Sequence, residues 1–196
     1  RALTLAKEGH IHGVIAVGGQ KAMNVGRLVA ALCNEVHDMY NFVDGAVPNT
    51  SSLPCICVPT TFRTPFLLTN QVSIVDSRNN QLKLLNVQNN LCRLLLIDPN
   101  MMLNLTENQR ASMSLEVLCQ ATEAYISQKE NFFSDMFVEK AVELMGYALD
   151  GSPSLEITTP QEILFAQSGV MTSIANGSSS LGVASLLAMT INARYK

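Results

Sequence analysis

The sequence predicts an α/β part followed by an all-helical part, and three observations support this fold class. A short apolar run at residues 13–19 ends in a double glycine and passes directly into a helical pattern. Two further apolar runs, at residues 53–61 and 92–99, predict strands, and the first of these is expected to be buried. After Pro99 the pattern is helical only, so we expect a border there: residues 1–99 form the α/β part and residues 100–196 the helical part.

In the α/β part, β-branched runs closed by glycine or proline predict strands, and apolar residues at helical spacing predict helices. The segment NQVSIVDSRNNQLKLLN predicts a hairpin, with its turn at Ser77–Asn80. The expected order is the end of a helix, a strand, a helix, a strand, the hairpin and a strand, over residues 1–9, 13–19, 22–39, 53–61, 70–86 and 92–99.

In the helical part, the starts of helices are marked by capping residues. Thr106 and Gln109 form one predicted capping box. Thr159 and Glu162 form another, with Pro160 at the first helical position. The third start is expected at Ser134 with Asp135. The expected helices cover residues 106–127, 134–149, 160–177 and 180–193.

Composition argues against several partners. Of the 196 residues, 47% are hydrophobic and 15% charged, the net charge is −3, and no basic run occurs, so nucleic acid and an anionic membrane surface are poor candidates. No apolar stretch reaches the roughly 18 residues that span a bilayer. The five cysteines have no metal-ligand spacing, and buried free thiols suit a reducing compartment, so we expect a cytoplasmic protein.

The turn at Gly18 and Gly19 is the first candidate binding site. A strand that feeds a helix through glycines exposes backbone N–H groups at the helix N-terminus, where they and the helix dipole favour an anion. No GxGxxG pattern follows, so a simple tight turn explains the glycines equally well. Lys21 either donates to a phosphate or lies in water.

Several segments, in order, resemble the iron-containing alcohol dehydrogenase family. GVIAVGGQKAMNVGR is similar to the family's strand–GGGSxxDxAK–helix loop, and VPTTFRTPFLLTN to its PTTxGTGSE segment. IDPNMMLNLTENQRASMSLEVLCQATEAYIS resembles the DP…DALTHAIEAY stretch, and ANGSSSLGVASLLA the helix with LGxxHA. The resemblance implies a dehydroquinate synthase-like architecture: a Rossmann-like nucleotide-binding part, then a helical metal-binding domain. It also implies that this chain is a fragment, without the family's first strands and last helices.

The resemblance implies NAD or NADP as cofactor, with Gly18 and Gly19 at the pyrophosphate and Thr60, Thr61 and Thr64 beside the nucleotide. Other positions of the two motifs depart from the family. In the first motif the departures are Gln20, Lys21, Asn24 and Arg27, and in the second Arg63, Pro65, Phe66 and Leu67. We expect the bulky residues of the second motif to crowd the cofactor cleft.

The family holds its divalent metal, often iron, with one aspartate and three histidines. Three of these positions are Glu116, Gln120 and Ser185 here, and the last would fall at or beyond Lys196. Glu116 and Gln120 are four apart and share a helix face, so the geometry of a site persists without its ligands. An amide and a hydroxyl bind iron or zinc far more weakly than imidazoles do. No other histidine, cysteine or acidic pair is expected to be catalytic.

Three functions follow from the resemblance. The first is an NAD(P)-dependent alcohol or aldehyde oxidoreductase with a degraded metal site and weak or no metal-dependent catalysis. The second is a non-catalytic pseudoenzyme that acts as a scaffold or partner subunit. The third is a related activity, as in glycerol dehydrogenases or dehydroquinate synthases, which also need a metal. Family members commonly assemble, so we expect a homo-oligomer, such as a dimer.

Overall fold

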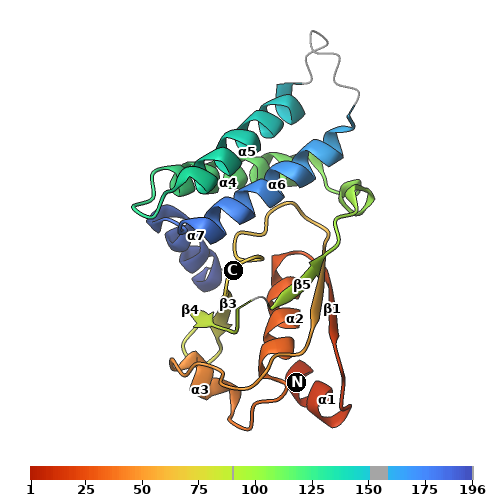
Figure 1. Cartoon of the computed structure of the whole chain (residues 1–196), viewed down its shortest axis with the longest axis vertical. Helices are drawn as coiled ribbons and strands as arrows, with labels where there is room; N and C mark the ends of the chain where they lie inside the picture. The colour runs from red at the N-terminus through yellow and green to blue at the C-terminus, as the bar shows by residue number, and fades with distance from the viewer. Residues whose placement is uncertain (90, 151–158, 196) are drawn as a thin grey trace. The chain divides into compact units, whose positions relative to one another are not determined.

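The computed structural model describes residues 1–89, 91–150 and 159–195, and they form two compact units (Figure 1). The first unit contains residues 1–58, 66–96 and 187–196, and the second contains residues 59–65 and 97–186. Each unit is described by itself.

The first unit is built on a three-stranded sheet with the order β1-β2-β5, in which β2 and β5 are parallel. Its elements are α1 (Ala2–Glu8), β1 (Val14–Gly18), α2 (Gln20–Leu32), α3 (Met39–Val43), β2 (Cys55–Pro59), β3 (Gln71–Asp76), β4 (Gln81–Asn86) and β5 (Cys92–Leu95). The predicted hairpin is confirmed: β3 and β4 pair antiparallel, and Asn80 in their turn has a positive φ of 56°.

The core of the first unit lies between α2 and the sheet (Figure 1). Met23 and Leu28 of α2 are buried in one cluster with Ala16 of β1 and with Cys55 and Cys57 of β2. The two cysteines point the same way, with their Sγ atoms 3.8 Å apart, as their spacing on a strand requires. All five cysteines are free, as predicted, but only Cys55 and Cys57 are buried.

The helix expected over residues 22–39 is shorter than predicted. It ends at Leu32, and a separate short helix, α3, begins after Asp38, whose carboxylate accepts from the Tyr40 N–H. Between them the buried Glu35 carboxylate accepts from the N–H groups of Asn49 and Thr50. This contact with a distant loop competes with continued helix, and local periodicity does not reveal it.

The second unit is helical, and the helices α4, α5 and α6 pack against one another (Figure 1). Its elements are η1 (Pro99–Met102), α4 (Glu107–Tyr125), α5 (Phe132–Asp150), α6 (Gln161–Ser178) and the start of α7 (Val183–Arg194), whose residues from Leu187 onward belong to the first unit. The core of the unit is apolar and includes Met113, Val117, Met145, Leu164 and Phe165.

Helix starts in this unit were predicted with mixed success. The Thr106–Gln109 capping box is present in full. The expected start at Ser134 is wrong by two residues, because Asn131 accepts from the N–H groups of Phe133 and Ser134 and acts as the cap. The second predicted box is also wrong: α6 has Pro160 at its N-cap and no side-chain cap.

Within the described residues, no single helix is long and apolar enough to cross a membrane. By length and composition alone, α6 and α7 meet that test only as a sharply bent pair, and much of α6 is buried in the second unit.

Candidate functional site

The glycine turn of the first unit has the geometry of an anion-binding helix start. Gly18 ends β1 with φ +141°, a conformation that favours glycine, and a Cβ there would also overlap the Ala22 side chain. Gly19 is the N-cap of α2, with no side-chain cap and no acidic residue in the first turn. The N–H groups of that turn can therefore donate to an anion.

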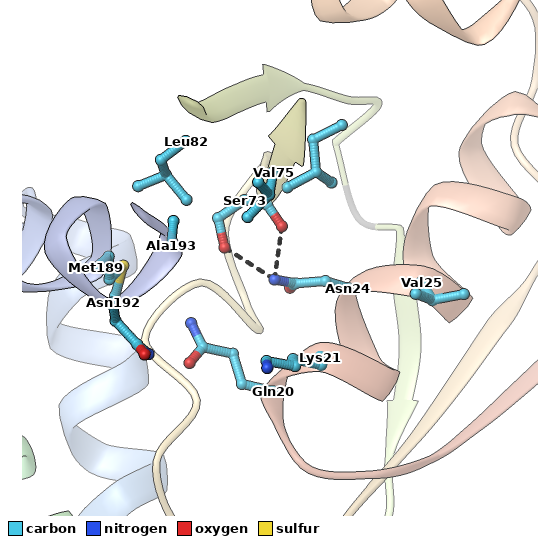
Figure 2. A pocket seen from close by; sticks show the side chains of 11 residues that line it. Gln20, Lys21, Asn24, Val25, Ser73, Val75, Leu82, Met189, Asn192 and Ala193 are labelled. Carbon is cyan, nitrogen blue, oxygen red and sulfur yellow. Dashed lines mark hydrogen bonds between the residues drawn. The ribbon is translucent and has the colours of Figure 1, made fainter. Parts of the chain in front are cut away.

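A pocket of about 260 Å³ adjoins this turn, and all of its lining residues belong to the first unit. Figure 2 shows Gln20 and Lys21 at the start of α2, with Asn192 and Met189 of α7 across the pocket from them. Apolar side chains of the hairpin, such as Val75 and Leu82, complete the lining. The pocket thus offers an anion-binding end and an apolar wall.

Asn24 and Arg27, two departures from the family motif, connect α2 to the hairpin region. The Asn24 Nδ2 donates to both the backbone O and the Oγ of Ser73, at 2.8 Å each (Figure 2). Arg27, only 1% exposed, donates to the backbone oxygens of Phe66 at 2.7 Å, Gln71 at 3.1 Å and Thr69 at 2.5 Å. Burial lowers the pKa of Arg27 from its usual value. Both residues therefore have structural partners.

The threonines predicted to lie beside the cofactor are in the second unit, whereas Gly18 and Gly19 are in the first. Thr64 is buried, and its backbone O accepts from the Ser173 hydroxyl of α6 at 2.5 Å. Thr61 has a buried Oγ1 with no partner among the described residues, and Thr60 is half-buried. The expected crowding of the cleft by Arg63 and Pro65–Leu67 stays a prediction.

Two of the metal-equivalent positions lie together in the second unit and form a polar chain. The Gln120 Nε2 donates to the Glu116 Oε1 at 3.1 Å, and the other oxygen of Glu116 accepts from the Arg63 Nη1 at 2.7 Å. Gln120 is 1% exposed, whereas the side chains of Arg63 and Glu116 are 33% and 29% exposed. Sequence reasoning noted Arg63 only as a departure and missed its pairing with Glu116.

The third metal-equivalent position, Ser185, lies in the first turn of α7. Its N–H and that of Gly182 donate to the Glu123 carboxylate of α4 at 3.0 and 3.2 Å. Glu123 therefore stabilises the start of α7, because a carboxylate suits the positive end of the helix dipole. The contact between Glu123 and the start of α7 was not predicted from the sequence.

In the part of the chain that the structure describes, no three His, Cys, Asp or Glu side chains come together to hold a metal ion. The three histidines, His10, His12 and His37, are exposed in the first unit. Because a neutral amide and a hydroxyl are weak ligands and the carboxylate is already paired, this donor set is a poor fit to iron or zinc.

Comparison with known proteins identifies the relatives of this chain. The sequence model described as iron-containing alcohol dehydrogenase matches residues 1–99, which is half of the chain. The chain belongs to the iron-containing alcohol dehydrogenase family. Among curated relatives, it is 29% identical over 133 residues to the 4-hydroxybutyrate dehydrogenase of Clostridium kluyveri, covering 67% of this chain and 35% of that enzyme. It is 26% identical over 152 residues to the long-chain-alcohol dehydrogenase 1 of Geobacillus thermodenitrificans, and the match covers 76% of this chain and 38% of that enzyme.

Solved structures confirm the predicted fold class for this family member. A 1,3-propanediol oxidoreductase matches with a TM-score of 0.86 at 19% identity, covering 98% of this chain and 50% of the other. The sulfoacetaldehyde reductase of Bifidobacterium kashiwanohense, solved in complex with NAD+, matches with a TM-score of 0.77 at 20% identity. This match covers 91% of this chain and 47% of the reductase. The chain thus spans half the length of these relatives or less.

Proposed function

We propose that this family member binds a nicotinamide nucleotide but lacks the metal-dependent catalysis of the iron-type alcohol dehydrogenases, or retains it only weakly. The observation that carries the proposal is the donor set at the three metal-equivalent positions: a carboxylate paired with Arg63, an amide, and a serine hydroxyl. A bound metal would polarise the substrate oxygen and stabilise an alkoxide. The residues at these positions do not supply an equivalent ligand set.

Nucleotide binding rests on the first unit. The N-terminus of α2 has a glycine N-cap without a side-chain cap, and it adjoins a pocket. An NAD+ complex is known for the sulfoacetaldehyde reductase of similar fold. We assign the pyrophosphate to Gly18 and Gly19, and we keep Thr60, Thr61 and Thr64 as residues beside the nucleotide. The cofactor is NAD or NADP, and a small alcohol or aldehyde is the substrate class that family membership favours.

The remaining assignments are proposals of the same kind. A catalytically inactive protein of this fold acts as a scaffold or as the partner subunit of an active relative, in a homo-oligomer or mixed oligomer such as a dimer. We place the domain border near residue 99, where η1 begins. Five free thiols suit the reducing cytoplasm.

Thermal unfolding of the full-length protein with NAD+, NADP+ and divalent metals tests the proposal. A nucleotide at about 100 times its Kd stabilises the folded state by about 2.7 kcal/mol, a rise of several degrees in Tm, and we expect this shift without added metal. Iron or zinc is expected to give no shift that EDTA reverses. A Tm that rises with metal and falls with EDTA would refute the loss of the metal site.

Substitution of Gly19 separates nucleotide binding from folding. Gly19 has φ −80°, a backbone conformation that any residue adopts, so in Gly19→Asp the carboxylate can cap α2 while it repels a phosphate. We expect Gly19→Asp to fold normally and to lose the NAD+ shift. Gly19→Asn is the matched control, because its neutral side chain also caps the helix, and it should retain most of the shift. Equal shifts in both variants would place the nucleotide elsewhere.

A further inference from the structure

We propose that the guanidinium of Arg63 takes the place of the metal ion in the second unit, as a cation that is part of the chain. The inference rests on the proposed loss of the metal site and adds what fills it. Arg63 stands where the family motif has a glycine, which has no side chain that could reach Glu116. The arginine at position 63 and the substituted metal ligands therefore belong together: the guanidinium replaces the metal ion as the cation beside Glu116.

The contacts of Glu116 support the exchange. Glu116 accepts from Gln120 through one oxygen and from Arg63 through the other. The first partner lies one turn along α4, and the second lies in the segment 59–65. In a metal site, the carboxylate and the side chain four residues later would converge on a cation. Here the second side chain donates to the carboxylate, and the positive charge comes from position 63.

Arg63 is positioned by the residues on both sides of it. The Phe62 ring stacks on Phe165 of α6, with the centroids 4.9 Å apart, and the Thr64 backbone accepts from Ser173 of the same helix. Gly169 of α6 lets the backbone of Phe62 approach closely, since a Cβ there would overlap the Phe62 carbonyl oxygen. The segment is therefore held on α6 while the Arg63 side chain reaches α4.

The environment of the head group indicates that Glu116 is its main partner. The Arg63 Nε is buried and has no partner among the described residues, whereas Nη1 pairs with Glu116 at 2.7 Å. A short contact between opposite charges whose side chains are about one third exposed is stronger than a fully exposed ion pair. The site is thus neutralised without an added ion.

The first test is the response of the full-length protein to Zn²⁺ and EDTA in a set of variants. We expect the wild type and Gln120→His to show no zinc-dependent change in Tm, because Arg63 occupies Glu116. In Arg63→Gly/Gln120→His, a free carboxylate and an imidazole four residues apart on α4 can bind Zn²⁺, and we expect a rise of about 2–5 °C that EDTA reverses. A zinc shift in Gln120→His as large as in the double variant would overturn the inference.

The second test is the stability of the variants without metal. We expect Arg63→Gln to lower Tm by about 2–4 °C and Arg63→Lys to lower it less, because the lysine keeps the charge. In Glu116→Gln the further effect of Arg63→Gln should largely vanish. Arg110→Gln is the matched control: Arg110 is 29% exposed and its carboxylate partner, Glu162, is 3.9 Å away, so we expect almost no change.

The outcomes separate this inference from the function on which it rests. If the wild type gains an EDTA-sensitive zinc shift, the proposed loss of the metal site fails, and the exchange fails with it. If the wild type is insensitive to metal but Arg63→Gln is as stable as Arg110→Gln, the loss of the metal site stands and the role of Arg63 is refuted.

Discussion

Arg27 shows how a single buried side chain can organise a turn. Its guanidinium donates to three backbone oxygens, those of Phe66, Thr69 and Gln71, and no shorter or neutral side chain can replace all three contacts. These hydrogen bonds stabilise residues 66–71, which lead into β3 within the first unit. Arg27 is therefore structural, although its position belongs to a cofactor-loop motif in the family.

We expect Arg27→Met to lower the free energy of unfolding by about 2–4 kcal/mol, because it removes three hydrogen bonds made by a buried guanidinium. The carbonyl oxygens of Phe66 and Gln71 keep a second donor, the Thr69 hydroxyl, so the Thr69 carbonyl oxygen is the most affected acceptor. Arg27→Lys should lower it less, since one ammonium keeps the charge and some of the hydrogen bonds. Urea unfolding followed by circular dichroism measures both. Arg93→Met, at an exposed position of β5, is the control and should be close to neutral. An Arg27→Met variant as stable as that control would contradict this role.

The sequence identified Asn24, Arg27 and Arg63 as unusual residues but did not predict their partners. Those partners lie 39 to 53 positions away along the chain, on segments that local spacing does not connect. The candidate site could thus be located by resemblance, while its ion pair and hydrogen bonds required the fold.

Elements were mostly predicted well where the signal was local, although Asn131 and not Ser134 caps α5. The periodic strands, the hairpin and the Thr106 capping box depend on neighbours within a few residues. Errors occurred where a distant group decided the end of a helix. One example is Glu35, which accepts from Asn49 and Thr50, and another is Glu162, expected in a capping box, whose carboxylate lies 3.9 Å from the Arg110 Nη1 of α4.

The predicted capping box at the start of α4 can be tested by substitution of Thr106. Thr106→Ala removes the hydroxyl that accepts from the Gln109 N–H, and we expect a loss of about 1 kcal/mol in the free energy of unfolding. Thr122→Ala is the control on the same helix, because its exposed hydroxyl only donates to the Leu118 carbonyl four residues back. In chemical unfolding, Thr122→Ala should show no loss in the free energy of unfolding. Equal losses would mean that the box contributes nothing.

The approach of α6 to segment 59–65 depends on Gly169. In Gly169→Ala the new Cβ would overlap the Phe62 carbonyl oxygen, so we expect a loss of about 2–4 kcal/mol. Gly146→Ala in α5 is the matched control: its Cβ would meet no atom within 4 Å, and removing a mid-helix glycine should add about 0.5–1 kcal/mol. If urea unfolding shows a loss of stability in Gly169→Ala and a gain in Gly146→Ala, the close contact between α6 and Phe62 is supported. A stabilised Gly169→Ala would refute it.

At the scale of the whole molecule, the fold is kept at low sequence identity, and the proposed loss of the metal site is a change within that fold. TM-scores of up to 0.86 accompany identities near 20%, so the architecture tolerates wide sequence change. The departures concentrate in the turn after β1, in segment 59–67 and at the metal-equivalent positions, and several of them pair with each other. Paired substitutions are expected when a polar site is replaced, because a buried polar group without a partner is costly.

The sheet of the first unit gives a last prediction. One face packs on α2 through Ala16, Cys55 and Cys57. On the other face, Ile15 and Val17 of β1 are 68% and 54% exposed within residues 1–196. Parallel sheets in α/β proteins are normally covered on both faces, and this chain spans half the length of its solved relatives or less.

We therefore expect residues 1–196, produced alone, to associate through this sheet face, since a contiguous exposed apolar surface promotes aggregation. Ile15→Lys should reduce that association, as measured by static light scattering at several protein concentrations. Leu5→Lys is the control, because Leu5 is similarly exposed, at 60%, but lies on α1 and not on the sheet. If Ile15→Lys scatters as much as the wild type while Leu5→Lys scatters less, the sheet face is not the surface through which the chain associates.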